Sequence, residues 1–298
     1  MMAEAVGAEA VGAEAVRAAA VRELHYRTGS PALGHFPGAH RSKRGDSGFE
    51  FRGHASLLDA PDPRRLDLHA SLRDAFGNWI VRVYSQRKSI PVVMVADLSA
   101  SMGFVGAAPK LEVLADFVES LSWSAWRTGD SFGFIGCDGG VRVDLLLPQT
   151  RSRGVGSALA ATLRALHLQG ASAHGLGLAH RHLGRQRSLV FLVSDFHLPL
   201  PEIEAVLDSM AHHDLMPVVL WDPLEFTLSA QRGLASVVDP ESGQRRMVWW
   251  RPALRQQWLA ARQARREALL GLFRAKRLKP LFIEGAFDAD AVTRHFHS

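Results

Sequence analysis

The sequence predicts a doubly wound α/β domain, in which helices cover both faces of a mostly parallel sheet. Several short runs are continuously apolar rather than alternating, which is typical of strands buried on both faces. Segments with helical spacing of apolar residues separate these runs, as strand–helix–strand units require. The chain has 298 residues, of which 47% are hydrophobic and 22% charged, so it can bury a core of this kind.

Strand and helix patterns alternate through residues 89–222, which we expect to form the core of the domain. Apolar runs of strand length occupy residues 90–96, 188–194 and 216–220, and the first two lead directly into Asp97 and Asp195. The turn Asp138-Gly139-Gly140 joins two further strands, residues 131–137 and 141–147, in a predicted hairpin. Helical spacing predicts helices over residues 111–126, 156–168, 175–183 and 201–213.

Residues 223–298 are expected to complete the domain. The pattern predicts a hairpin from residues 235–238 and 247–250, a long basic helix over 252–277, a strand over 280–283 and a closing helix over 288–296. The long helix has an apolar stripe that predicts its buried face and leaves the arginines on the opposite face. This stripe consists of Leu254, Trp258, Ala261, Ala268, Leu269, Leu272 and Phe273.

The first 88 residues are predicted to lie outside the core. Residues 1–27 begin with a five-residue repeat that fits neither helix nor strand periodicity, so we expect a mobile low-complexity tail. Residues 28–88 are expected to form a separate N-terminal segment. Its first part, residues 28–63, is rich in Gly, Pro, Ser and His, which predicts mostly loop with one short strand near residues 49–51.

Composition excludes several classes of protein. The single cysteine, Cys137, excludes an internal disulfide framework and a cysteine-rich zinc site. No run of eighteen apolar residues is present, so no membrane-spanning helix is predicted. Glu4, Glu9 and Glu14 stand where a signal peptide would need basic and apolar residues. We therefore expect a soluble, cytoplasmic protein.

Basic residues are concentrated near the C-terminus. Residues 245–279 hold 11 Lys and Arg against one Asp or Glu, whereas residues 89–244 hold 10 against 16. No recognised nucleic-acid motif accompanies the basic segment, so nucleic-acid binding is the less favoured interpretation. A solvated helix face or docking on an acidic protein partner are the alternatives. The candidate partner-binding residues are Arg262, Arg265, Arg266 and Trp250, the last because Trp249 and Trp250 are expected to alternate between core and solvent.

Two predicted strands end in a carboxylate, and the first is followed by two hydroxyls at alternate positions. In open α/β sheets, ligands bind outside the carboxyl ends of the strands. Asp97, Ser99, Ser101 and Asp195 are therefore expected to converge there. Such hard oxygen ligands suit Mg²⁺, with Mn²⁺ or Ca²⁺ as alternatives. Because hydroxyls are neutral, the bound cation would accept a carboxylate from another molecule.

Two other interpretations of these residues stay open. The aspartates and serines could simply cap the following helices. Alternatively, the same aspartates could serve a Mg²⁺-dependent phosphoryl-transfer or hydrolytic enzyme. The enzyme is disfavoured because Ser99 stands where a second aspartate would be needed, and Lys110 is the one lysine not excluded as a phosphate ligand. No phosphate-binding P-loop motif is present, and His174, His180 and His182 are spaced as surface histidines rather than metal ligands.

The predicted site resembles the metal-ion-dependent adhesion site of von Willebrand factor A (vWA) domains, which have a Rossmann-like fold. The run Val95-Ala96-Asp97-Leu98-Ser99-Ala100-Ser101-Met102 is similar to the first motif of that site. Gly170-Ala171-Ser172 stands where the family has a threonine, so the resemblance makes Ser172 a further ligand. Asp195, within Leu192-Val193-Ser194-Asp195-Phe196, matches the aspartate of the third loop.

A wider resemblance covers residues 41–298 and is to the vWA family encoded beside MoxR-type AAA+ ATPases. It makes residues 28–88 and 223–298 family-specific extensions of the vWA core. The runs that carry it are Phe51-Arg52-Gly53, Asp62-Pro63-Arg64-Arg65-Leu66-Asp67, Ser71-Leu72-Arg73, Val81-Arg82-Val83 and Asp239-Pro240-Glu241-Ser242-Gly243.

This resemblance implies a non-enzymatic adaptor that binds proteins through a divalent metal and works with a MoxR-type AAA+ ATPase. The partners it implies are that ATPase and a client protein, which supplies a carboxylate to the metal and is matured or activated. Short members of the family resemble an accessory protein of methanol-dehydrogenase operons, so a metalloenzyme such as methanol dehydrogenase is the client it suggests.

Overall fold

The computed structural model describes residues 22–27, 37–41, 50–85, 87–168, 172–226, 233–238 and 245–297. Its centre is a six-stranded sheet in which only the edge pair β6–β7 is antiparallel. In spatial order the strands are β12 (Leu281–Glu284), β9 (Asp214–Trp221), β8 (Leu189–Ser194), β5 (Pro91–Asp97), β6 (Ser131–Cys137) and β7 (Val141–Thr150). The predicted fold class, a doubly wound and mostly parallel α/β sheet, is confirmed.

The direction of winding reverses at β5. From β5 the chain adds β6 and β7 on one side, then crosses to place β8, β9 and β12 on the other. Asp97 is the last residue of β5, and Asp195 follows the last residue of β8. Because β5 and β8 are parallel neighbours, both aspartates lie at the carboxyl edge of the sheet where the strand order reverses.

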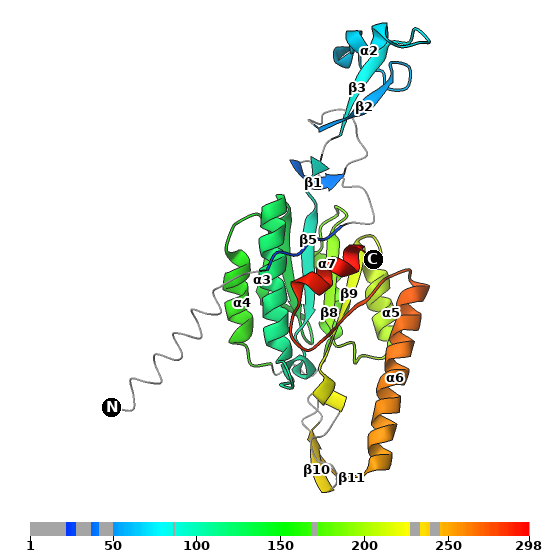
Figure 1. Cartoon of the computed structure of the whole chain (residues 1–298). Helices are drawn as coiled ribbons and strands as arrows, with labels where there is room; N and C mark the ends of the chain where they lie inside the picture. Colours follow the sequence, from blue (N-terminus) through cyan, green and yellow to red (C-terminus); the bar gives the residue numbers. More distant parts are fainter. Residues whose placement is uncertain are drawn as a thin grey trace, which may run out of the picture.

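Helices cover both faces of the sheet, and alternate residues of β5 face opposite layers. Val92, Met94 and Ala96 belong to one buried cluster, and Val93 and Val95 to the other. The first cluster is covered by α3 (Lys110–Thr128), α4 (Val155–Arg164) and α7 (Ala289–His297), the second by η3 (His174–His182), α5 (Leu200–Ser209) and α6 (Pro252–Ala275) (Figure 1). Among the described segments, no helix combines the length and hydropathy needed to cross a bilayer.

Part of the segment predicted to be a mobile tail is packed against the core. Leu24 and Tyr26 are buried, and the Leu24 amide donates to Ser124 Oγ of α3 at 2.9 Å. The Tyr26 hydroxyl donates to Asp130 Oδ2 at 2.6 Å, and burial together with Asp130 raises the pKa of Tyr26. Assigning residues 22–27 to the tail was therefore wrong, because their apolar side chains complete the core. Residues 1–21 lie outside the described residues.

The N-terminal extension contains more regular structure than its composition predicted. Asp67 organises it: its carboxylate accepts from the Ala70 amide at 3.1 Å and from Arg82 Nε at 2.7 Å. These contacts connect a short helix to a hairpin, and neither is visible in local composition. The elements are β1 (Pro37–Arg41), β2 (Glu50–Ser56), η1 (Pro63–Arg65), α2 (Leu68–Leu72), β3 (Ile80–Ser85) and β4 (Arg87–Lys88), with β1 pairing β4 and β2 pairing β3.

Three predicted helices differ from those observed. Residues 174–182 form the 3-10 helix η3 rather than an α-helix, since Gly175 packs against the β6–β7 turn and its amide donates to Asp138 O at 2.8 Å. The helix predicted to reach residue 213 ends at Ser209 because β9 starts at Asp214 and the chain must turn first. The helix predicted to reach residue 168 ends at Arg164.

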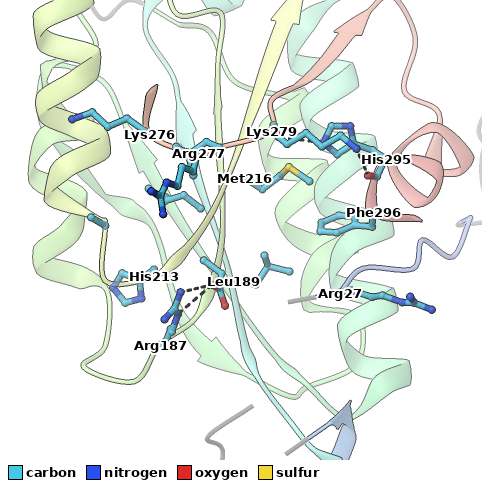
Figure 2. Close-up of a pocket in the computed structure, with 14 residues that line it drawn as sticks. Arg27, Arg187, Leu189, His213, Met216, Lys276, Arg277, Lys279, His295 and Phe296 are labelled. Atoms are coloured by element: carbon cyan, nitrogen blue, oxygen red, sulfur yellow. Dashed lines mark hydrogen bonds and ion pairs between the residues drawn. The ribbon is translucent and has the colours of Figure 1, made fainter. Parts of the chain in front are cut away.

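Short helices and a hairpin lie at the carboxyl end of the strands, and a groove with basic residues lies at their amino end. At the carboxyl end lie η2 (Ala100–Gly103), η4 (Pro223–Phe226) and the projecting hairpin of β10 (Gly233–Val238) and β11 (Arg245–Trp250) (Figure 1). At the opposite end, a groove of about 520 Å³ has Arg27, Arg187, Lys276, Arg277 and Lys279 in its lining (Figure 2). The site and the basic groove therefore lie at opposite ends of the strands.

Helix α6 ends in a conformation that usually requires glycine. Arg277 has a φ of 58°, and the amides of Arg277 and Leu278 donate to Arg274 O at 2.9 Å and Phe273 O at 2.8 Å. This is the Schellman pattern, in which the left-handed position favours glycine because a Cβ is strained there.

We expect Leu24→Ala to lower the free energy of unfolding by about 2–4 kcal/mol, because it leaves a cavity between α3 and α7. Urea denaturation followed by circular dichroism measures the change. Leu58→Ala is the matched control, since that side chain is 89% exposed and its loss should cost less than about 0.5 kcal/mol. Equal effects of the two substitutions would contradict the packing of residues 22–27.

We expect Arg277→Gly to raise the free energy of unfolding by about 1 kcal/mol, because glycine removes the strain of the left-handed conformation. The same denaturation experiment measures it. Arg274→Gly, in the interior of the last helical turn, is the control and should destabilise by about the same amount. A destabilised Arg277→Gly would show that side-chain contacts of Arg277 outweigh its backbone strain.

Candidate functional site

The candidate site begins with two carboxylates on neighbouring strands. Asp97 and Asp195 are each 1% exposed. Ser194, the last residue of β8, connects them, because its hydroxyl donates to Asp97 Oδ2 at 2.6 Å. The second Asp97 oxygen accepts from the Ser99 amide at 2.9 Å. Two negative groups are thus held at one buried edge, as the sequence predicted for Asp97 and Asp195.

Two hydroxyls lie beside these carboxylates. Ser99 and Ser101 are 1% and 5% exposed, and their Oγ atoms are 3.1 Å apart. Adjacent oxygens around an octahedral Mg²⁺ ion are about 2.9 Å apart, given metal–oxygen distances of about 2.0–2.1 Å. The two hydroxyls are hydrogen-bonded to each other, and their separation is close to that of two neighbouring metal ligands. Hydroxyl and carboxylate groups both offer hard oxygen atoms, which suit Mg²⁺.

Burial and neighbouring charges shift the pKa values of both carboxylates. Burial raises the pKa of Asp97 to about 6, and the charge of Asp195 acts in the same direction. Burial alone would also raise the pKa of Asp195, but His197 and Lys110 outweigh it and lower that pKa. At neutral pH the edge of the sheet therefore holds an ionised Asp195 and an Asp97 whose negative charge is incompletely compensated. A cation bound there would compensate it.

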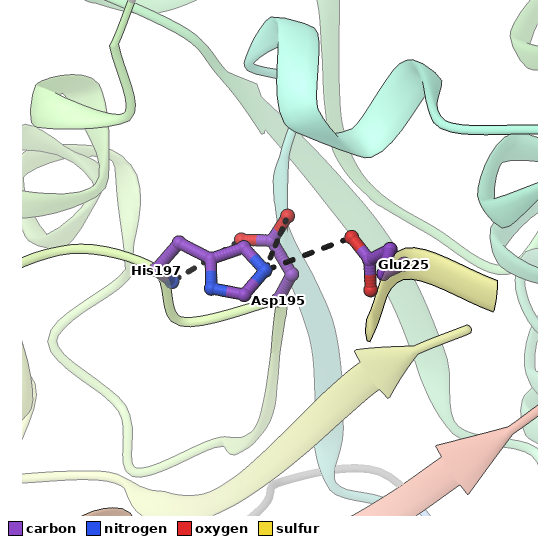
Figure 3. Close-up of side chains that lie close together, drawn as sticks. All are labelled: Asp195, His197 and Glu225. Atoms are coloured by element: carbon purple, nitrogen blue, oxygen red, sulfur yellow. Dashed lines mark hydrogen bonds and ion pairs between the residues drawn. The ribbon is translucent and has the colours of Figure 1, made fainter. Parts of the chain in front are cut away.

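A second layer of charged groups surrounds Asp195. The Lys110 ammonium, 3% exposed, donates to Asp195 Oδ2 at 2.9 Å and pairs with Glu225 of η4. His197 Nε2 lies 3.6 Å from Glu225 Oε1 and 3.9 Å from Asp195 Oδ2 (Figure 3). Burial alone would lower the pKa of His197, but Asp195 and Glu225 raise it. One ligand atom each from Asp195, His197 and Glu225 lies within 4.8 Å of the others, close enough to share a cation.

The structure records no contact between Ser172 and the other predicted ligands. Its hydroxyl instead lies near the β6–β7 turn, 3.6 Å from where a Cβ on Gly139 would be. Four of the five predicted metal ligands are therefore brought to one edge of the sheet. The role of Ser172 as the fifth stays a prediction.

Three arginines of α6, Arg262, Arg265 and Arg266, are partly buried rather than on a solvated face. Arg262 and Arg266 pair with Glu284, and their guanidinium groups lie over the rings of Trp221 and Phe282. Expecting these arginines to lie opposite the apolar stripe was wrong. The reason is that arginine side chains cover apolar rings while keeping their charged ends paired.

Arg265 supports the loop that carries the site. Its Nη2 donates to Phe196 O at 2.6 Å and also to Leu198 O. Phe196 has a φ of 53°, so this loop takes a backbone conformation that non-glycine residues rarely adopt. Arg265 is thus engaged within the chain, and the predicted docking role of the three arginines stays a prediction.

The hairpin presents a tryptophan, although a different one from the predicted contact. Trp249 is 65% exposed, and Met247, two residues earlier on β11, is 62% exposed. Residues two apart on a strand share a face, so these two side chains form an exposed apolar face of the hairpin. The side chain of Trp250, the predicted contact, lies outside what the structure describes.

Several residues of the site were not singled out as ligands by the sequence. Lys110 had been considered only as a phosphate ligand, although its place at the start of the helix after the metal motif was a usable signal. Glu225 and His197 follow β9 and β8 by a few residues, but their side-chain directions depend on loops without periodicity. His174 and His180 are exposed, in agreement with their expected place on the surface.

Comparisons with known proteins give the family. The chain is an α/β domain whose doubly wound sheet has polar side chains at its carboxyl edge, the place where open α/β sheets generally bind ligands. The chain belongs to the family described as "Protein of unknown function DUF58", whose model matches residues 61–268. An uncharacterized protein in the moxR 3' region of Paracoccus denitrificans is 40% identical over 87 residues, which is 29% of this chain and 77% of that protein. These findings confirm the resemblance to the MoxR-associated vWA family.

Solved structures with related folds overlap most of the chain at low identity. An aerotolerance-related membrane protein from Bacteroides fragilis is 12% identical, with a TM-score of 0.41, covering 70% of this chain and 97% of that one. The SpRpn10 VWA domain is 14% identical, with a TM-score of 0.42, covering 69% of this chain and 95% of that one. At these scores the likeness carries no argument about function.

We expect Asp97 to contribute a fall in the free energy of unfolding as pH rises from about 4 to 6, measured in EDTA as the difference between the wild type and Asp97→Asn. The folded protein keeps the Asp97 proton up to about pH 6, whereas the unfolded chain releases it near pH 3.8. Unfolding therefore releases a proton in this window, and rising pH favours it. The loss is on the order of 2–3 kcal/mol and is constant above pH 6.

Asp97→Asn should show a smaller fall over the same window, measured by urea denaturation at several pH values. Asp59→Asn, an exposed carboxylate far from the site, should keep the wild-type slope and is the control. If Asp97→Asn keeps the full slope, the uncompensated charge is not at Asp97.

Proposed function

We propose that this chain is a non-enzymatic adaptor that binds proteins through a divalent cation, Mg²⁺ first, with Mn²⁺ or Ca²⁺ as alternatives. Asp97, Ser99, Ser101 and Asp195 would hold the cation, with Ser172 as a further ligand. The cation supplies an electrophilic position that accepts a carboxylate of the bound protein. The chain's own residues would fix the positions of the ligand oxygens. Their burial would keep other small ligands away from the cation.

The observation that carries this proposal is the pair of facing hydroxyls of Ser99 and Ser101, 3.1 Å apart and buried beside two carboxylates. Hydroxyls placed only to cap helices would have backbone amides as partners. Ser99 is the N-cap residue of η2, and its side chain makes no capping hydrogen bond there. Two of the proposed ligands are neutral, and Lys110 already compensates part of the charge of Asp195, which would leave a bound dication able to accept a carboxylate from another molecule.

The proposed ATPase partner is a MoxR-type AAA+ protein. The relative in the moxR 3' region of Paracoccus denitrificans supports this link. We further propose that the client is a protein that the ATPase matures or activates, with methanol dehydrogenase as the candidate that the resemblance names.

The surface beside the metal position supports a protein as the bound molecule. Val105, in the loop after η2, is 73% exposed, and Leu224 of η4 is 46% exposed. The loop and η4 are joined by Asp222, whose Oδ2 accepts from the Ala108 amide at 2.9 Å and Oδ1 from the Leu224 amide at 2.8 Å. Together with Met247 and Trp249 of the hairpin, these residues present apolar area at the carboxyl end of the sheet. Exposed aromatic and methionine side chains such as these are enriched in protein interfaces.

No observation favours the phosphoryl-transfer alternative. Its best candidate for holding a phosphate was Lys110, and the three N–H groups of that ammonium have three acceptors within the chain. We therefore propose the adaptor and keep the enzyme as an outcome of the test.

We expect the chain to bind the MoxR-type ATPase of its own organism, or that ATPase with its client, in Mg²⁺ and to lose binding at least about tenfold in EDTA. Biolayer interferometry with the purified proteins measures this. The double variant Ser99→Ala, Ser101→Ala should lose binding to the same extent, because it removes the two neutral ligands.

Ser209→Ala is the matched control, since Ser209 lies at the end of α5 and its hydroxyl donates to Val206 O within that helix. Circular dichroism checks that the double variant is folded. Equal binding in Mg²⁺ and EDTA would remove the metal from the proposed function. Turnover of a generic phosphate ester that Asp97→Asn abolishes would replace the adaptor by the enzyme.

A further inference from the structure

Lys110 lies at the centre of the charged cluster around Asp195. It is the first residue of α3 and is 2% exposed, although lysine side chains are rarely buried. Its Nζ donates to Ser101 O at 3.3 Å, to Asp195 Oδ2 at 2.9 Å and to Glu225 Oε1. An ammonium has three N–H donors, so each finds one acceptor here. The side chain is therefore a fully coordinated cation inside the protein.

The oxygens that hold this ammonium are those that could hold a metal ion. Asp195, His197 and Glu225 each offer one ligand atom, and these atoms lie within 4.8 Å of one another. The Lys110 ammonium contacts two of the three residues. The side chain of His197 is 33% exposed and is the most exposed of the three residues, which lie together in Figure 3. The ammonium thus stands among ligands that would otherwise attract a cation from solution.

We propose that Lys110 is a resident cation that competes with the divalent ion for Asp195 and Glu225, and so sets the metal affinity of the site. This inference rests on the proposed function, because it concerns the same edge of the sheet. A divalent ion at Asp97, Ser99 and Ser101 competes with the ammonium for Asp195. Binding of the divalent ion therefore requires the ammonium to move away from Asp195.

The hydrogen bond to Ser101 O links the position of the Lys110 ammonium to the backbone of the predicted metal motif. Ser101 lies in η2, so the ammonium holds the backbone of the metal motif as well as two carboxylates. Glu225 lies in η4, which the Asp222 contacts fasten to the loop of residues 104–108. Movement of Lys110 away from Asp195 would therefore release η2 and η4 together. Leu224 of η4 and Val105 of the loop that follows η2 are the exposed residues proposed to contact the partner.

The test is calorimetric titration of the full chain with Mg²⁺ and, separately, Mn²⁺. Lys110→Met keeps the length of the side chain and removes its charge. We expect this variant to bind the metal at least about tenfold more tightly than the wild type, because like charges a few Å apart repel strongly in a buried site. Lys110→Arg keeps the charge and should show no such gain.

Lys276→Met is the matched control. Lys276 is also ion-paired, with Glu204 and Asp208, but it lies at the far end of α6. Its loss should leave the metal affinity unchanged. Weaker or unchanged binding by Lys110→Met would overturn the proposal, and so would an equal gain in Lys110→Arg, since the charge would then not be the cause.

These results separate the inference from the proposed function. Metal binding by the wild type, with no gain in Lys110→Met, overturns the inference alone. Binding by Lys110→Met and not by the wild type supports the inference and removes the metal from the proposed function. No binding by either protein overturns both.

Residue-resolved lysine acetylation of the wild-type protein keeps the proposal testable if Lys110→Met does not fold. The chain has five lysines, and Lys276 and Lys279 serve as internal references. We expect Lys110 to react slowly without metal and at least about fivefold faster in saturating Mn²⁺, measured by peptide mass spectrometry. Unchanged reactivity of Lys110 when calorimetry shows bound Mn²⁺ would overturn the proposal.

Discussion

Charge compensation at the point where the strand order reverses is the constraint on which this end of the molecule depends. The reversal makes β5 and β8 neighbours, so Asp97 and Asp195 are buried side by side. Two like charges in a poorly solvated place destabilise the fold unless other groups compensate them. Hydrogen bonds from Ser194 and the Ser99 amide reach Asp97, and Lys110 reaches Asp195. The loops at this edge are arranged around that requirement.

The basic character of α6 is explained by the same edge of the sheet. Trp221 Nε1 donates to Asp195 O at 2.8 Å, and Arg265 holds the two carbonyls that follow in the same loop. Arg262 in turn covers the Trp221 ring. The arginines thus act as a support for the loop that presents Asp195, and the density of positive charge in the sequence reflects contacts within the chain. A run of arginines is poor evidence for docking when its partners within the fold are unknown.

The sequence predicted the sheet and the first carboxylates because both depend on local pattern. Continuous apolar runs identified β5 and β8, and the residue after each run is fixed in position by the strand it ends. Lys110, Glu225 and Arg265 could not be assigned in this way, because irregular loops set their directions. Their contacts also span long stretches of sequence: 85 positions for Lys110–Asp195, 115 for Lys110–Glu225 and 69 for Arg265–Phe196. Residues 22–27 were misassigned for a related reason: two apolar side chains are too few to show a period, although they fill a place in the core.

The segment of residues 22–27 joins the two ends of the described chain. The His25 amide donates to Thr293 Oγ1 of α7 at 3.0 Å, across 268 positions of sequence. Contacts at such separation form late, since the intervening chain must first be ordered. On the ribosome, residues 22–27 emerge long before α7. The helix that accepts the hydrogen bond of the His25 amide has therefore not yet been synthesised. Residues 22–27 are therefore synthesised early and fixed among the last, and closure of this part of the core waits for α7.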